Sequence, residues 1–451
     1  MEFRKIIYAL MSAATISLTA CAPNVLYRHD YSPCVVADDN HCDSAAISLH
    51  YQNTDDAFEL GFVEYDDQGQ LRDRAQMQAV LDHYYPIAGT DDVLLTVFVH
   101  GWHHNAAPGD TNIESFKGLL RNMSRKESEA ATQDGRKKRR ILGVYIGWRG
   151  ESITAPVLTD ATFWARKAVA QEVGLQGVSE VLLRLEEIVN VKAGYEDVPR
   201  PLNSRMVIIG HSFGGAVVYT SLQQILADRY VDSRRGKTFQ DTAKGFGDLV
   251  VLMNPAFEAM RYSTLFDISQ SCVASANTCR AYTHDQLPRL AVLTSEADYA
   301  TRYAFPAGRF FATLFETHDK LERYIATEDG PTKITVNEAD ADDITIGHFE
   351  PYWTHRLDPI ENATKRSDDF NWRSLVGTWS QQQYDGTMAF EQVNLEHLGR
   401  SDPLNPYLNV YVSGKLIKDH NDIWGDEIQG FLHDLIVIST TPNRVESEPS
   451  Q

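Results

Sequence analysis

The chain has 451 residues, of which 43% are hydrophobic and 23% are charged. This composition supplies ample apolar material for a packed core and excludes a disordered or collagen-like polymer, and the length allows one large domain or two to three of average size. The 62 acidic and 42 basic residues give a net charge of −20, which repels phosphate backbones, so nucleic acid is not expected as a partner.

The first twenty residues have the pattern of an export signal. Arg4 and Lys5 form a short positive region, and residues 6–20 form an apolar segment too short to span a bilayer comfortably. An ordinary secretory signal would show the same two parts. Residues 1–20 are therefore expected to be a signal peptide.

The end of this signal resembles the lipobox of bacterial lipoproteins, because Leu-Thr-Ala precedes Cys21. The resemblance implies that Cys21 becomes the mature N-terminus and carries a diacylglyceryl group and a further acyl chain. Several buried chains, at about 0.8 kcal/mol per methylene, form a stable anchor. Ala22 rather than Asp follows, which by resemblance to Gram-negative lipoproteins favours the outer membrane. We expect a lipid-anchored protein of a bacterial cell envelope that faces the periplasm, with residues 21–45 as a tether.

Four further cysteines remain: Cys34, Cys42, Cys272 and Cys279. An even number in an exported chain indicates disulfides, and four cysteines allow three connectivities. The pairs 34 with 42 and 272 with 279 are favoured, because each closes a short local loop. Metal binding by these cysteines is the alternative, but the chain has no CxxC spacing and export disfavours free thiolates.

The main body of the chain predicts an α/β architecture. Residues 57–65, followed by Asp-Asp-Gln-Gly, predict an antiparallel edge strand and a turn, and residues 71–85 predict a helix behind it. Short aliphatic runs then recur, bounded by Gly, Pro or charged residues, as in strands buried on both faces of a parallel sheet. These runs are residues 93–99, 141–146, 206–209, 249–253, 290–294 and 408–412.

Two regions between these runs predict additions to the sheet. Residues 159–191 have a helical pattern, and residues 302–400 show weak periodicity and many acidic residues. We expect insertions near 150–200 and 302–400, the latter over the sheet edge rather than in its centre. The predicted domain covers residues 46–440, and residues 441–451 form a C-terminal tail.

The run at 93–99 ends in His-Gly-Trp-His-His-Asn at residues 100–105. A strand that ends in His-Gly and a bulky residue resembles the oxyanion loop of lipases and esterases, which implies that the backbone N–H groups of Trp102 and Phe213 bind an oxyanion. The alternative is a metal site made of His100, His103 and His104. It is disfavoured, because this spacing lacks the glutamate of zinc peptidase helices and lies in a glycine-containing loop. No metal is expected.

The run at 206–209 leads directly into Gly-His-Ser-Phe-Gly at residues 210–214, and apolar residues at helical spacing follow. A tight strand-to-helix turn projects the Ser212 hydroxyl beyond the backbone, where a base can reach it, and the helix N-terminus favours negative charge on a substrate. The alternative is a glycine-rich turn without chemistry. Strand, GxSxG and helix together predict a nucleophilic serine.

These motifs are similar to those of serine hydrolases of the α/β hydrolase superfamily, over most of residues 90–440. The resemblance implies a mostly parallel central sheet with helices on both faces, and a triad in the chain order Ser, acid, His. Asp298 follows the run at 290–294 and is the expected acid, with Glu296 as the alternative.

The expected base is His420, in the loop between the last predicted strand, 408–412, and a closing helix with apolar residues from 428 to 436. His348, which also follows an apolar stretch, is the alternative base. His211, beside the nucleophile, is expected to pack or to orient a neighbour.

The resemblance implies a hydrolase of carboxylic esters or thioesters that forms an acyl-enzyme and needs no cofactor. Its substrate would be a small molecule or a lipid. An acyltransferase with the same triad and a non-catalytic envelope lipoprotein on the same fold are the alternatives.

Overall fold

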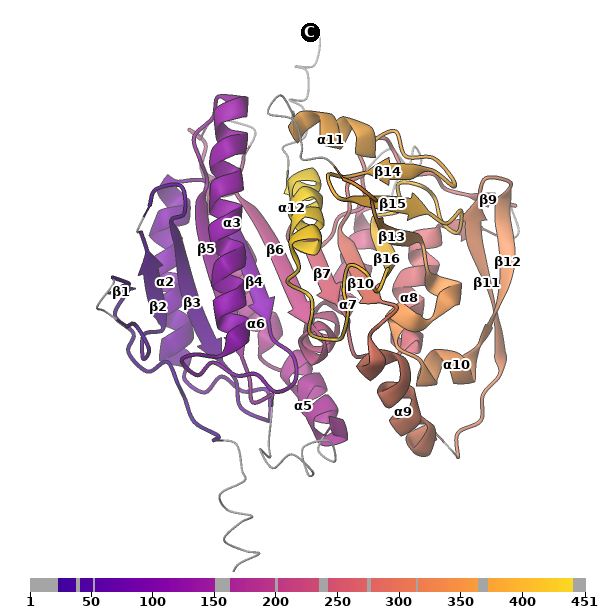
Figure 1. Cartoon of the computed structure of the whole chain (residues 1–451), viewed down its shortest axis with the longest axis horizontal. Helices are drawn as coiled ribbons and strands as arrows, with labels where there is room; N and C mark the ends of the chain where they lie inside the picture. Colours follow the sequence, from indigo (N-terminus) through magenta and orange to yellow (C-terminus); the bar gives the residue numbers. More distant parts are fainter. Residues whose placement is uncertain are drawn as a thin grey trace, which may run out of the picture.

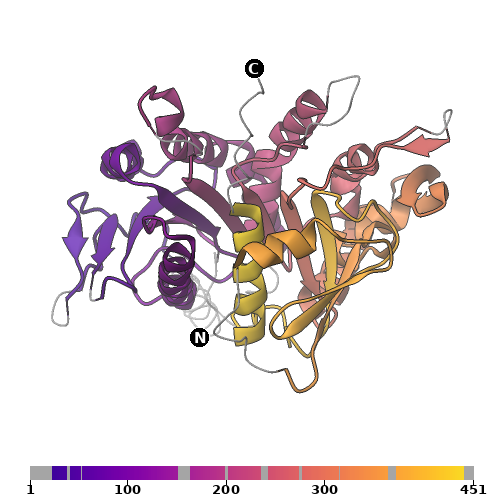
Figure 2. The same ribbon diagram turned by 90° about the horizontal axis from the view of Figure 1, so that it is seen from above.

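The computed structural model describes residues 23–37, 41–51, 53–150, 163–198, 202–234, 242–273, 277–313, 315–363 and 372–440. The predicted signal peptide at residues 1–20, the predicted lipidation site Cys21 and the predicted tail at 441–451 lie outside these residues. One sheet runs through the molecule, with helices on both of its faces (Figure 1). The same layers are seen from above in Figure 2.

The sheet has twelve strands, and the eight from β3 to β13 in sheet order run parallel. Across the sheet the order is β1 (Cys34–Val35), β2 (Ile47–His50), β3 (Phe58–Glu64), β5 (Arg140–Gly147), β4 (Val93–Val99), β6 (Arg205–His211), β7 (Leu249–Met253), β10 (Leu290–Ser295), β16 (Tyr407–Val412), β13 (His355–Pro359), β15 (Val393–His397) and β14 (Thr387–Ala389). The prediction of an α/β protein with a large, mostly parallel sheet is confirmed, and all six aliphatic runs lie in its strands.

The strand predicted at 57–65 is β3, but its expected place at the edge of the sheet is wrong. β3 pairs antiparallel with β2 and parallel with β5, and all seven of its residues are buried. The strands outside it, β1 and β2, are only two and four residues long. Strands this short give little periodic signal, so the sequence pattern does not predict them.

Helices cover the two faces according to the direction in which the chain crosses the sheet. The chain passes from β3 beyond β5 to β4 and then turns back to β5; since such crossovers are right-handed, the two connecting helices lie on opposite faces. One face carries α2 (Arg74–Thr90), α6 (Val178–Val189), α7 (Phe213–Ser233) and α8 (Ala259–Gln270). The other carries α3 (Thr111–Asp134) and α12 (Asp426–Thr440), linked by a 3.0 Å hydrogen bond from Asn122 to Gln429.

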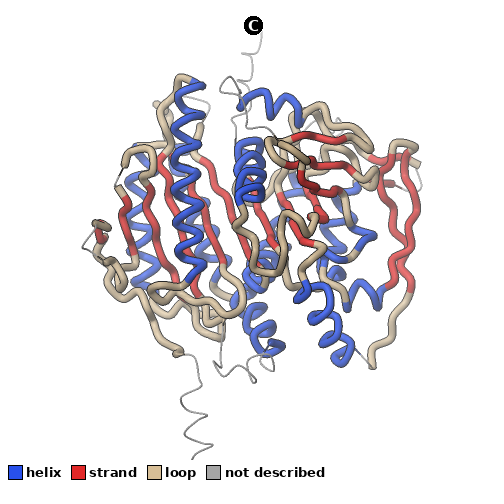
Figure 3. Tube along the Cα trace, in the orientation of Figure 1, coloured by secondary structure: helices blue, strands red, loops and turns tan. Residues whose placement is uncertain are grey.

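The two regions expected to hold insertions contribute differently. Residues 163–189 form α5 (Phe163–Leu175) and α6, which connect β5 to β6. The later region carries α9 (Phe305–Thr313), the hairpin of β11 (Lys320–Thr327) and β12 (Gly330–Asn337), α10 (Glu338–Asp343) and α11 (Trp372–Trp379). It also supplies β13, β15 and β14, which continue the sheet beyond β16 (Figure 3). β16 is therefore the last strand of the chain but an inner strand of the sheet.

Both favoured disulfides are present. Cys34 bonds to Cys42, and Cys272 bonds to Cys279 across the small hairpin of β8 (Cys272–Val273) and β9 (Thr278–Cys279). Within the described part of the chain, no helix is both long and apolar enough to cross a membrane.

Candidate active site

The candidate site lies where the chain reverses its direction across the sheet. After β4 the chain moves to β5 on one side, and after β5 it moves to β6 on the other, so the carboxyl ends of β4 and β6 are neighbours. Ligands of open α/β sheets bind at such a switch point. The loop after β4 begins at His100, and the turn after β6 holds Ser212.

Ser212 occupies a strained turn between β6 and α7. Its backbone has φ 56° and ψ −121°, a conformation that side-chain-bearing residues rarely adopt. The turn is held because the Ser212 amide donates to Met253 of the next strand at 3.0 Å. A Cβ on Gly214 would collide with the carbonyl oxygens of Val99 and His100, so only glycine fits beside β4. The strained turn that holds Ser212 therefore lies between two central strands of the sheet.

Three side chains predicted from separate parts of the sequence meet at this turn. His420 Nε2 lies 2.6 Å from Ser212 Oγ, and His420 Nδ1 lies 2.8 Å from Asp298 Oδ2. An ionised carboxylate only accepts, so Nδ1 carries the proton and the unprotonated Nε2 accepts from the serine hydroxyl. Ser212 is 3% exposed and the Asp298 side chain is fully buried. The geometry allows proton transfer from the hydroxyl to the imidazole.

Asp298 is held as a buried carboxylate. Burial acts to raise its pKa, but the electrostatic attraction and hydrogen bond between Asp298 and His420, together with hydrogen bonds from the Thr301 hydroxyl and amide, outweigh this effect. The pKa of Asp298 therefore lies below the ordinary carboxyl value, and the group is ionised at neutral pH.

Two further residues fix the backbone of His420. His211 Nε2 and Asn254 Nδ2 each donate to the His420 carbonyl oxygen at 2.9 Å. Burial is the main cause that lowers the pKa of His211 to about 3, so its ring is neutral and orients a neighbour as expected. Asn254 also accepts from the Ser295 amide at 2.9 Å, which joins the loops after β7 and β10.

Asn254 and Thr301 were not predicted from the sequence. Asn254 directly follows the strand at 249–253, so a polar residue at the carboxyl end of a central strand was the available signal. Thr301 lies in the π-helical turn Ala300–Ala304 and offered no comparable signal.

The chain segments that carry the two expected oxyanion donors both lie against Ser212. Phe213 is the first residue of α7, and the first N–H groups of a helix have no partner within it. Gly101 precedes Trp102, and a Cβ on Gly101 would lie 2.8 Å from the Ser212 Cβ, so the loop after β4 passes directly against the serine. The two chain segments that hold the expected donors are thus brought together.

The histidines of this loop serve structural contacts. His100 Nδ1 donates to the Gly101 carbonyl at 2.9 Å, and His100 Nε2 accepts from the Trp148 amide at 3.0 Å. Burial lowers the pKa of His100 to about 4, so both of its nitrogens are used in the neutral form and neither offers a lone pair to a metal. His104 contacts Asp110 at 3.1 Å.

The two alternative site residues lie beside the triad with other partners. Glu296 accepts from the Gly414 amide at 2.9 Å. His348 Nε2 lies 3.1 Å from Thr301 Oγ1, on the side of Asp298 away from the serine, and burial lowers its pKa to about 4. His348 thus supports the acid through Thr301 instead of facing the nucleophile.

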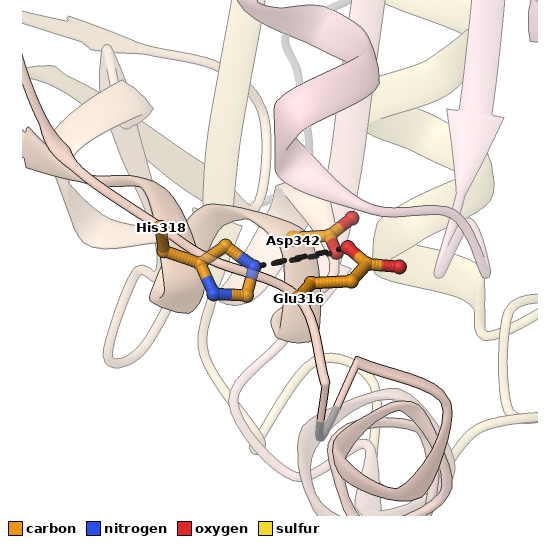
Figure 4. Close-up of side chains that lie close together, drawn as sticks. All are labelled: Glu316, His318 and Asp342. Carbon is orange, nitrogen blue, oxygen red and sulfur yellow. Dashed lines mark ion pairs between the residues drawn. The ribbon is translucent and has the colours of Figure 1, made fainter.

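A cluster of possible metal ligands lies elsewhere among the described residues: Glu316, His318 and Asp342 (Figure 4). His318 Nε2 is 3.9 Å from an oxygen of each carboxylate. However, Arg309 already contacts both oxygens of Asp342 at 2.8 Å. The group is accounted for as an ion-pair cluster near the surface.

Comparisons with known proteins add little to this geometry. No family model matches the chain, and no curated protein matches it. Among solved structures, an uncharacterized protein from Pseudomonas aeruginosa is similar with a TM-score of 0.21 and 11% identity, over 53% of this chain and 42% of that chain. The match spans less than half of that protein, and a similarity this low supports no conclusion about function.

Proposed function

We propose that the chain is a serine hydrolase of the α/β hydrolase type that cleaves carboxylic esters or thioesters. The observation that carries the proposal is the continuous contact from Ser212 Oγ through His420 to Asp298, at 2.6 and 2.8 Å. The three residues follow each other in the chain order of that superfamily. The strained serine at the carboxyl edge of a parallel sheet gives further support.

The proposed reaction proceeds in two steps. His420 Nε2 takes the Ser212 proton as the hydroxyl oxygen attacks the acyl carbonyl, and the imidazolium then gives this proton to the leaving alcohol or thiol. In the second step His420 takes a proton from water as the water oxygen attacks the acyl carbonyl. The bond between the acyl carbon and Ser212 Oγ then breaks, the imidazolium returns the proton to that oxygen, and the acid leaves. Asp298 keeps the Nδ1–H tautomer and stabilises the imidazolium in both steps.

The backbone N–H groups of Trp102 and Phe213 would bind the oxyanion of each tetrahedral intermediate. Each well-placed donor is worth about 3 kcal/mol in the transition state. The position of Phe213 at the start of α7 supports this role, since the helix dipole also favours negative charge there. The side chains assigned to the reaction are enough for acyl transfer without a cofactor.

We also propose that Cys21 carries the lipid anchor expected from the lipobox and holds the chain at the outer membrane of a bacterial envelope. The two disulfides support export to an oxidising compartment. The lipid anchor is tested by mass spectrometry of the N-terminal peptide.

A fluorophosphonate probe tests the nucleophile. The probe should label the full chain, and Ser212→Ala should abolish the labelling while circular dichroism shows an unchanged fold. Ser128→Ala is the matched control and should be labelled as the parent is, because Ser128 lies on α3 and its hydroxyl donates to Asp55 instead of contacting a histidine. Labelling of Ser212→Ala at the parental rate would refute the assignment.

A panel of esters and thioesters then separates hydrolysis from acyl transfer. Product analysis with and without an added alcohol or amine shows whether water is the acceptor. A probe-reactive serine with no turnover of any ester would place the chain outside this reaction class.

A further inference from the structure

We propose that the carboxyl edge of the sheet rests against a lipid bilayer and that the site acts on acyl esters held in that bilayer. The contact is made by an aromatic surface consisting of Tyr299, Tyr303, Phe310 and Phe315. The substrate class rests on the proposed function, whereas the membrane contact can be measured without it.

The aromatic surface is unusual for its exposure. Tyr299 is 70% exposed, Tyr303 53%, Phe310 54% and Phe315 94%, all within seventeen residues. Single exposed apolar residues are normal on a soluble surface, but a group of large ones marks a site of interaction. Tyrosine and phenylalanine also suit the boundary between water and lipid, where an apolar ring can be buried while a phenolic hydroxyl stays hydrated.

The aromatic surface is fixed next to the triad. Tyr299 directly follows Asp298, and its ring lies 5.3 Å from that of Tyr303. Phe305, at the start of α9, packs at 6.5 Å against Phe163, which in turn lies 4.8 Å from Phe213. α9 therefore begins beside the proposed oxyanion site. It projects past the carboxyl edge of the sheet next to α5 (Figure 1).

The beginning of the described chain lies at the same edge. The Tyr27 amide donates to Glu64, the last residue of β3, at 3.0 Å. Pro23 and Val25 line one small pocket together with Trp148, at the end of β5, and Val25 is 49% exposed. A lipid on Cys21 would be two residues from this point, so the anchor and the aromatic surface would meet one membrane at the same edge of the molecule.

The net charge of the chain indicates which kind of lipid the aromatic surface would contact. A net charge of −20 opposes binding to an anionic surface. The attraction must therefore come from apolar burial, which salt does not screen. Neutral lipid is the occupant that fits, and a bilayer in contact with this edge would present its acyl esters close to Ser212.

The contact is tested with the full chain reconstituted into phosphatidylcholine vesicles. The fluorescence of bimane attached to Phe315→Cys should shift to the blue when vesicles are present. Doxyl-labelled lipid should quench this fluorescence at least twofold more than that of bimane attached to the matched Val231→Cys. Val231 is 48% exposed and lies near the end of α7, whereas the carboxyl edge of the sheet is at the beginning of that helix. The difference should persist at 0.5 M salt. Equal quenching at the two positions would overturn the proposal.

Two further measurements separate the possible failures. In Tyr303→Ser/Phe315→Ser, hydrolysis of a vesicle-borne ester should fall at least tenfold, while hydrolysis of a water-soluble ester stays within twofold of the parent. Equal loss on both esters, or no loss on the vesicle-borne one, would overturn the inference. If neither ester is cleaved even by the parent, the proposed function fails and the bimane result alone decides the membrane contact. Pyrene excimer emission from position 315 in vesicles would overturn the proposal in favour of a second copy of this chain.

Discussion

At the acid end of the triad, the Thr301 hydroxyl lies between the Asp298 carboxylate and the His348 ring. It donates to Asp298 Oδ2, and its oxygen is 3.1 Å from His348 Nε2. The hydroxyl has one proton, so His348 donates and Thr301 accepts. The donation from His348 thus leaves the Thr301 hydroxyl proton pointing at Asp298, so a residue outside the triad fixes the direction of this hydrogen bond.

Replacing Thr301 with Val removes this donor while keeping the shape of the side chain. We expect kcat/KM for a soluble ester to fall about tenfold, equivalent to about 1.4 kcal/mol, because the ionised acid loses a charge-assisted hydrogen bond. Thr301→Ser keeps the hydroxyl and should retain most of the activity. Steady-state kinetics on both variants checks this, and a loss in Thr301→Ser as large as that in Thr301→Val would contradict the assignment of the effect to the hydroxyl.

The positions of the catalytic candidates could be predicted because each follows a strand. Ser212, Asp298 and His420 all lie just past aliphatic runs, and parallel strands end at a common edge. The supporting contacts could not be predicted in the same way. Whether Asn254 reaches the His420 carbonyl depends on how the loops after β7 and β16 cross, and no local pattern encodes that crossing.

At the scale of elements, the start of α3 fastens the loop that passes Ser212. Asp110 caps α3 by accepting from the Asn112 amide at 2.9 Å, and its carboxylate also binds the Asn105 amide and the His104 ring. Burial acts to raise the pKa of Asp110, but the hydrogen bonds from the His104 ring and the Asn105 amide and the electrostatic effect of the nearby histidines together outweigh it, so the pKa is lowered and the cap is charged. The Asp110 carboxylate therefore holds the end of the loop after β4 and also caps the start of α3.

Asp110→Ala should lower the free energy of unfolding by about 1 kcal/mol through loss of the cap. It should also lower kcat while KM changes less, because the loop that carries Trp102 is no longer held by the Asp110 carboxylate. Asp110→Asn can still cap and should restore most of the stability. Denaturant unfolding and kinetics on the pair check this, and full activity in the Ala variant would contradict the coupling.

Predictability also differs among elements. The central strands are long and apolar on both faces, so their runs identify them. β13 carries His355, Arg356 and Asp358 in five residues, and β14 has only three residues. Polar or short strands at the far side of the sheet are specified by their neighbours rather than by their own pattern.

At the scale of the whole molecule, several histidines are kept neutral by burial. Burial lowers the pKa of His100, His348 and His397 to about 4 and that of His211 to about 3, and it also lowers that of His355. In the unfolded chain these rings have an ordinary pKa near 6.5. Below that pH the unfolded chain binds protons that the folded chain cannot bind.

The contribution of these neutral rings to the free energy of unfolding should therefore be fully present above pH 6.5 and should be lost as the pH drops toward 4. The limiting slope is about 1.4 kcal/mol per pH unit for each neutral ring. Denaturant midpoints at pH 7.5, 6.5, 5.5 and 5.0 measure it, and His355→Phe, outside the site, should reduce the slope. Constant stability between pH 7 and 5 would contradict the protonation states given above.

The long sequence separation between the proposed catalytic residues determines when the proposed activity could first arise. His420 is 208 residues from Ser212 and 122 from Asp298, and contacts so distant in sequence form slowly and late in folding. A growing polypeptide has no candidate base for Ser212 until residue 420 has been synthesised. The ester-cleaving activity proposed for this protein would thus be absent until the chain has been synthesised past that residue and has folded.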